Sequence, residues 1–142
     1  MLLGEHEHSL DDKNRLTLPA RHREELGDRV VVSRGLDGCL YVHSAAEWDR
    51  LRERVRTLDP FESEARTMRR WFFASASEAE LDRQGRLVIP APLLRHAGIT
   101  REVTVLGVDD HLEVWDRAAW QEQQQRVEGR AEDVAQRLAN RD

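Results

Sequence analysis

Residues 6–27, HEHSLDDKNRLTLPARHREELG, decide the fold because residues 77–98, SEAELDRQGRLVIPAPLLRHAG, repeat their pattern 71 positions later. Self-similarity at a fixed offset indicates an internal duplication. The identical pairs are Glu7 and Glu78, Leu10 and Leu81, Asp11 and Asp82, Arg15 and Arg86, Leu16 and Leu87, Pro19 and Pro90, Ala20 and Ala91, and Gly27 and Gly98. The chain is therefore built from two related halves.

The duplication continues at an offset of 72 after one inserted residue. It then matches Val31 with Val103, Gly35 with Gly107, Asp37 with Asp109, Leu40 with Leu112, Val42 with Val114, Ala46 with Ala118, and Trp48 with Trp120. The halves, 5–48 and 77–120, are too short at about 44 residues to bury a good core alone. We expect them to pack as one pseudo-two-fold unit, with linker helices over 49–76 and a C-terminal helix over 121–142.

Each half predicts the order strand, tight turn, strand, short helix, strand, turn, strand, helix. Asn14 and Gly85 stand at equivalent turn positions, and these residue types best tolerate a positive φ. Pro19 and Pro90 suit the first position of a helix. The expected fold is a β-rich α+β barrel unit with flanking helices.

The longer helices follow the second hairpin of each half. Ser44 and Asp116 are good N-cap residues, and residues 44–47, SAAE, fit a capping box. Helical spacing of apolar residues predicts core or subunit contacts. The stripes are Trp48, Leu51, Val55 and Leu58; Phe61, Ala65, Met68 and Phe72; and a narrow seam of Val127, Ala131, Val134 and Leu138.

Length and composition describe one ordinary domain. The chain has 142 residues, of which 39% are hydrophobic and 35% are charged, which is enough for a packed core. No apolar run approaches the ~18 residues that a membrane helix needs. Acidic residues stand near the N-terminus, where a signal peptide carries bases. We therefore expect a cytoplasmic protein without membrane contact.

The distribution of charge is more informative than its sum. A formal net charge of −5 argues against indiscriminate nucleic-acid binding. Residues 82–101 nevertheless carry four arginines against one acid, whereas residues 102–125 carry six acids against one arginine. A local basic site is compatible with this pattern.

Enzymatic and metal sites have weak support. Cys39 is the only cysteine, which excludes an intramolecular disulfide and a cysteine-based zinc cluster. His6, Glu7 and His8 offer ligand chemistry on one strand, but Ala79 replaces His8 in the second half. We expect no catalytic residue, no metal, no cofactor and no small-molecule substrate.

The most informative shared element is the turn itself, residues 11–15, DDKNR, and residues 82–86, DRQGR. Both follow the pattern Asp-x-x-x-Arg. In a structural interpretation, Asp11 and Asp82 stabilise the turn through backbone amides and pair with the arginine.

In a functional interpretation, the same turns present Arg15 and Arg86 to DNA. An arginine fork bonds bidentately to guanine O6 and N7 in a major groove that admits a β-ribbon. Lys13 and Arg83, near the tips, would then contact phosphate.

Larger segments resemble the two halves of MraZ proteins, a bacterial family in the SpoVT-AbrB, swapped-hairpin superfamily. They are DDKNRLTLPARHREELGDRVVV, LDRQGRLVIPAPLLRHAGI, GLDGCLYV and EVWD. The resemblance implies a nucleoid-associated transcriptional regulator of the division and cell-wall gene cluster. It implies repression, including that of its own promoter, through short G-rich direct repeats in double-stranded DNA.

The resemblance also implies self-association into a ring, in which several modestly basic loops reach one DNA segment. Carried onto this chain, the DNA-binding loops contain Asp11 with Arg15 and Asp82 with Arg86. Asn14 replaces the usual glycine, and His6 stands where tyrosine is usual.

The same superfamily offers an alternative function. Some swapped-hairpin proteins are antitoxins, whose tail binds and inhibits a toxin. The C-terminal helix would then be the toxin-binding element. Such antitoxins usually carry a single half-repeat in each chain.

Overall fold

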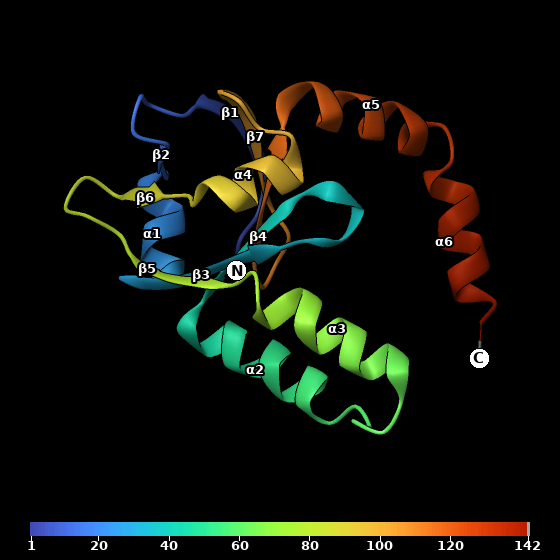
Figure 1. Ribbon diagram of the computed structural model, residues 1–142. Coiled ribbons are helices and arrows are strands. Elements are labelled where there is room, and N and C mark those ends of the chain that lie inside the picture. The colour runs from blue at the N-terminus through green and yellow to red at the C-terminus, as the bar shows by residue number, and fades with distance from the viewer. Residues whose placement is uncertain (142) are drawn as a thin grey trace.

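The computed structural model describes residues 1–141. Asp142, the last residue of the predicted C-terminal segment, lies outside the described residues. Figure 1 shows a central sheet with helices around it. The elements are β1 (Glu5–Ser9), β2 (Arg15–Thr17), α1 (Ala20–Leu26), β3 (Arg29–Arg34), η1 (Leu36–Gly38), β4 (Leu40–Ser44), α2 (Ala45–Arg56), α3 (Ser63–Phe73), β5 (Ser77–Glu80), β6 (Arg86–Val88), α4 (Ala91–Ala97), β7 (Glu102–Gly107), β8 (Leu112–Asp116), α5 (Arg117–Glu128) and α6 (Ala131–Ala139).

The strands exchange partners between the halves. A six-stranded sheet has the order β1-β7-β8-β4-β3-β5, and β2 pairs with β6 in a separate two-stranded sheet. All of these neighbouring strands pair in antiparallel fashion. Because β1 pairs with β7 and β5 pairs with β3, the opening strands of each half lie in the other half. This confirms the α+β fold of two swapped-hairpin half-repeats around a pseudo-two-fold axis.

The core lies between the two sheets. Leu16 and Leu87 from the two-stranded sheet are fully buried. They share one cluster with the valines and leucines of β3, β4, β7 and β8. Burying such a side chain stabilises the fold by about 1.5–3 kcal/mol, so the small sheet is held to the large one by apolar contact.

The structural equivalence of β3 and β7 differs from the sequence alignment. Arg29 pairs with Glu80 and Glu102 pairs with Ser9, which gives an offset of 73 instead of 72. The connection after α4 is two residues longer than the one after α1, and the following hairpin loop is one residue shorter. Runs of valine look alike at either offset, so identity alone misplaced these strands by one residue.

Local signals place the turns and helix starts well. Asn14 and Gly85 have φ values of 58° and 73°, as predicted. Ser44 Oγ accepts the Glu47 backbone N–H at 3.2 Å, and Asp116 caps α5 through Ala119 N at 3.1 Å. Pro19 and Pro90 are N-cap residues, one position before the predicted one.

The remaining helices lie outside the paired strands. The α2 and α3 helices form an antiparallel pair beneath the sheet in Figure 1, and Val55 and Phe72 are buried there. The C-terminal stretch forms two helices, because α5 ends at Glu128 with Gly129 as its C-cap and α6 begins at Ala131. In the described part of α5 and α6, no residue is buried. The boundaries 5–48, 49–76, 77–120 and 121–142 stay a prediction.

Among residues 1–141, no helix combines the length and apolar character needed to cross a membrane.

Candidate nucleic-acid interface

Two loops, residues 11–14 and 82–85, lead into the paired strands β2 and β6. Because these strands are antiparallel, the loops lie at opposite ends of one two-stranded ribbon. Figure 1 shows both on the side of the molecule away from α5 and α6. The backbone extends the pairing into the loops, since Leu18 N donates to Gly85 O and Ile89 N donates to Asn14 O, both at 3.0 Å. Each half therefore supports the loop of the other half.

The first loop is closed by Asp11. Its Oδ1 accepts the backbone N–H groups of Lys13 and Arg15, both at 2.9 Å. Its Oδ2 accepts Arg15 Nε at 2.6 Å. We call this arrangement the Asp–Arg clamp. The clamp holds the Nε atom of the guanidinium group and leaves its two terminal nitrogens, Nη1 and Nη2, for other acceptors.

The second loop repeats the clamp. Asp82 Oδ1 accepts from Gln84 N at 2.9 Å and from Arg86 N at 2.8 Å, while Oδ2 accepts Arg86 Nε at 2.6 Å. The structural interpretation of the Asp-x-x-x-Arg pattern is thus confirmed in both halves.

Both carboxylates are ionised. Hydrogen bonding from the Arg15 backbone lowers the pKa of Asp11 to about 2, with a weaker contribution from the Arg15 side chain that acts against partial desolvation. The Arg86 backbone and side chain lower the pKa of Asp82 in the same way. Each arginine is therefore held by a charged acceptor at neutral pH.

The arginines lie on the outer face of the ribbon. The side chains of Arg15 and Arg86 are 25% and 29% exposed, whereas Leu16 and Leu87 between them point into the core. Lys13 and Arg83 are exposed, and within the described range neither forms an ion pair. The structure thus brings the predicted residues to one side of the molecule and leaves cationic groups open there.

Arg23 on α1 is a basic residue of this surface that the sequence analysis missed. Its side chain covers Gly85 so closely that a Cβ on Gly85 would overlap Arg23 Cδ. The equivalent position on α4 is Leu94, which is buried. No periodic signal marks Arg23, because its role depends on the loop of the other half.

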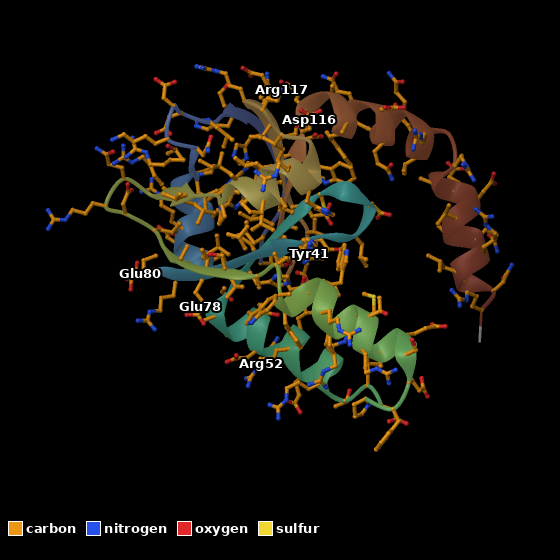
Figure 2. All side chains as sticks on the ribbon, in the orientation of Figure 1. Tyr41, Arg52, Glu78, Glu80, Asp116 and Arg117 are labelled. Atoms are coloured by element: carbon orange, nitrogen blue, oxygen red, sulfur yellow. The ribbon has the colours of Figure 1, made fainter. Side chains whose placement is uncertain are left out.

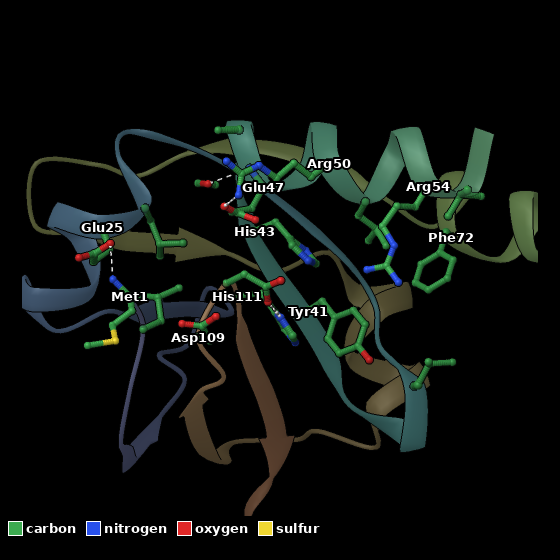
Figure 3. A pocket seen from close by; sticks show the side chains of 18 of the residues that line it. Met1, Glu25, Tyr41, His43, Glu47, Arg50, Arg54, Phe72, Asp109 and His111 are labelled. Carbon is green, nitrogen blue, oxygen red and sulfur yellow. Dashed lines mark hydrogen bonds and ion pairs between the residues drawn. The ribbon is translucent and has the colours of Figure 1, made fainter. Parts of the chain in front are cut away.

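A cavity lies apart from the ribbon, between α2, β4 and the N-terminal segment. Its volume is about 920 Å³, and Figure 3 shows Tyr41, His43 and His111 on its wall. The His43 and His111 rings stack with centroids 5.0 Å apart. Burial, followed by His111, lowers the pKa of His43 to about 4. Burial opposes charge on His111, but hydrogen bonds to Glu113 and Asp110 raise its pKa.

The described residues form neither the metal site nor the cysteine nucleophile that the sequence analysis considered. The His6 ring lies tilted against the His22 ring with centroids 5.6 Å apart, and Glu7 forms an ion pair with Arg117 at 2.9 Å. Across the described chain, no group of three or more His, Cys, Asp or Glu side chains is arranged to hold a metal ion. Cys39 is fully buried, and burial raises the pKa of its thiol, so it is no activated nucleophile.

The fold and the loops define a duplicated α+β protein of two swapped-hairpin half-repeats, each of which displays an arginine loop. Two consecutive stretches of the chain, residues 1–71 and 72–142, each match the family described as "MraZ protein, putative antitoxin-like". The chain belongs to the MraZ family.

Proteins named "Transcriptional regulator MraZ" are similar to this chain over nearly their whole length. The one from Caldanaerobacter subterraneus subsp. tengcongensis is 41% identical over 140 residues, covering 99% of this chain and 98% of that protein. The one from Heliobacterium modesticaldum is 40% identical over 142 residues, covering 100% and 99%. The one from Thermoanaerobacter sp. strain X514 is 41% identical over 138 residues, covering 97% and 96%. These names describe regulators of transcription and not enzymes.

Proposed function

We propose that this MraZ-family chain is a sequence-specific DNA-binding transcriptional regulator whose β2–β6 ribbon enters the major groove. The observation that carries the proposal is the repeated Asp–Arg clamp on one exposed ribbon. A two-stranded ribbon fits the major groove, where guanine presents O6 and N7. The names of the relatives support the same class of function.

The clamp explains how the arginines would read a base. Asp11 and Asp82 each hold the Nε atom of their arginine, so the two terminal nitrogens can donate side by side to guanine. Because the carboxylate fixes the guanidinium before binding, less side-chain entropy is lost on contact. Asp11 and Asp82 act as positioning residues, and Arg15 and Arg86 read the base.

Lys13 and Arg83 would bind the DNA backbone. Both are exposed near the loop tips and would contact phosphate without reading sequence. Such contacts release counterions and make affinity depend on salt. The acidic stretch 102–125 would face away from the DNA.

Self-association completes the proposal. A ring of copies would present several ribbons to one DNA segment, and effective concentration would combine individually weak contacts. From the resemblance to the MraZ family we propose that the chain represses a division and cell-wall gene cluster, including its own promoter. It would bind G-rich direct repeats on the nucleoid in the cytoplasm. Regular spacing of the repeats would match regular spacing of the ribbons.

The test is a pair of double variants in a mobility-shift assay with DNA selected from a random pool. Arg15→Ala with Arg86→Ala should abolish binding and leave the mass of the assembly unchanged. Arg52→Ala with Arg56→Ala is the matched control, because both arginines are exposed on α2 and make only 3.9 Å ion pairs. Figure 2 shows Arg52 on α2 at the lower side of the molecule, apart from the loops. Retained binding by the first variant would refute the proposal.

One observation favours the antitoxin function as a second candidate. Val134 and Leu138 on α6 are 40% and 57% exposed, and α6 stands apart from the sheets in Figure 1. An apolar helix face of this kind suits a partner groove. Purification from the host decides between the two: a stoichiometric small partner on the tail favours the antitoxin, and a homo-oligomer alone favours the regulator.

A further inference from the structure

The outer face of the β2–β6 ribbon carries two side chains besides the arginines, Thr17 and Val88. The register sets Arg15 opposite Val88 and Thr17 opposite Arg86. Leu16 and Leu87, between them, are fully buried. Since side chains alternate between the faces of a strand, Thr17 and Val88 share the outer face with both arginines.

The pairing brings each arginine close to its cross-strand neighbour. Backbone bonds run from Leu18 to Gly85 and from Ile89 to Asn14. The alternation of an antiparallel ladder therefore makes Arg15–Val88 a non-hydrogen-bonded pair, as it does Thr17–Arg86. In such pairs the facing Cβ atoms lie about 4.5–5.5 Å apart. Successive bases are stacked about 3.4 Å apart, so a side chain beside a guanine-reading arginine falls against a neighbouring base pair.

Within the described residues, Val88 lies outside the apolar core. It is 55% exposed although it belongs to the ribbon whose inner face is completely buried. Its β-branched side chain has few rotamers, so its methyl groups project from the ribbon in a fixed direction. The only apolar group on the base edges of the major groove is the thymine C5 methyl.

We propose that Val88, and more weakly Thr17, are specificity-determining residues that contact the C5 methyl group of a thymine next to the guanine read by the opposite arginine. The inference rests on the proposed DNA-binding function. Each cross-strand pair would then recognise two adjacent bases. The arginine selects guanine, and the β-branched residue selects the thymine beside it.

The two pairs differ in a way that the test can use. Val88 offers only methyl groups to the base. Thr17 is half-buried and also carries a hydroxyl group, which bonds to several bases. Thymine selection should therefore be sharper beside Arg15 than beside Arg86.

The experiment measures dissociation constants for a duplex selected from a random pool by the unmodified protein. Each thymine is replaced in turn by deoxyuridine, which lacks only the C5 methyl group. One thymine next to an essential guanine should show a loss of about four-fold, the factor that corresponds to ~0.8 kcal/mol for one buried methyl group. Val88→Ala should bind the thymine duplex about four-fold more weakly and show no further loss with deoxyuridine.

Two further variants separate recognition from folding. Val88→Thr should keep the deoxyuridine penalty because it keeps a methyl group. Val108→Ala in the turn between β7 and β8, where the valine is 38% exposed, is the matched control and should bind both duplexes as the unmodified protein does. A selected motif without thymine beside guanine, or an unchanged deoxyuridine penalty in Val88→Ala, would overturn the inference. Either result leaves the proposed function standing if the arginine double variant still loses binding, whereas binding by that double variant overturns the proposed function itself.

Discussion

The two Asp–Arg clamps reach the same geometry from different sequences. Between the aspartate and the arginine, the first loop has Asp12-Lys13-Asn14 and the second has Arg83-Gln84-Gly85. The Nε to Oδ2 distance is nevertheless 2.6 Å in both. The duplication thus preserves the carboxylate, the guanidinium and the positive φ, and leaves the tip residues free to differ.

The surroundings of the two loops differ more than the loops themselves. Gly85 is buried under Arg23, while Asn14 is exposed. Outside the clamps, Val88 stands where the other half has Thr17. We infer that the clamps carry the shared function and that their neighbours set how the two halves differ.

The largest expected effect distinguishes the two arginines from the rest of the surface. Arg15→Ala and Arg86→Ala, made singly, should each weaken binding to selected DNA by about 1–3 kcal/mol, or roughly 5- to 150-fold, because each removes one bidentate contact to guanine. Fluorescence anisotropy at fixed salt measures both. Equal losses would fit two equivalent clamps, and no loss in one variant would show that only the other loop meets DNA.

The next effect is a difference in the free energy of unfolding between substitutions at the two equivalent turn positions, Gly85 and Asn14. Gly85→Ala should lower the free energy of unfolding by about 1–2 kcal/mol, because a Cβ is disfavoured at positive φ and would displace Arg23. Asn14→Gly should change it by no more than about 0.5 kcal/mol, as for an exposed site that accepts glycine. Urea denaturation measures both values. Similar losses in the two variants would contradict the difference in burial.

A smaller effect concerns the salt dependence. Arg83→Ala and Lys13→Ala should each reduce the slope of log affinity against log salt by about one unit, with affinity lowered evenly across sequences. The matched control is Arg137→Ala on α6, which should keep the slope of the unmodified protein. A change of preferred sequence in either tip variant would contradict the assignment to phosphate.

The smallest effect is the pH dependence of stability. The folded pKa of Asp11 is about 2 against an ordinary value of 3.8, and that of Asp82 is shifted in the same direction. A lowered folded pKa adds stability above the unfolded pKa, and this stability is lost as pH falls from about 4 to about 2. Asp11→Asn with Asp82→Asn should flatten the unfolding profile in that window. An unchanged profile there would show that the clamps do not stabilise the fold.

The sequence predicts these loops well because their signals are local. The left-handed turns follow from Asn14 and Gly85, and the helix starts follow from Ser44 and Asp116, since each depends on one residue type and its own backbone. The pairing of β2 with β6 is different. The sequence analysis did not predict it, because no local pattern says which half supplies a partner strand.

The sequence predicts strand register, the break between α5 and α6, and the burial of single apolar residues less well, because these features depend on contacts distant in the chain or on one residue such as Gly129. The shift of β3 against β7 is set by pairing with β5 and β1, which a run of valines does not reveal. The structure divides the C-terminal stretch into two helices where the sequence analysis expected one, because Gly129 ends α5. Phe61, expected in the core or at a subunit contact, is 91% exposed at the turn between α2 and α3, so it is not part of the core of this chain, and a subunit contact stays a prediction.

The central claim is that the two clamped arginines read separate guanines, and base-analogue substitution tests it most directly. Each guanine of the selected duplex is replaced by 7-deazaguanine, which removes the N7 acceptor, and affinity is measured for the unmodified protein, Arg15→Ala and Arg86→Ala. We predict two separate sets of guanines: one loses its N7 dependence in Arg15→Ala and the other in Arg86→Ala. N7 dependence that is unaltered in both variants, or absent from the unmodified protein, would contradict the account.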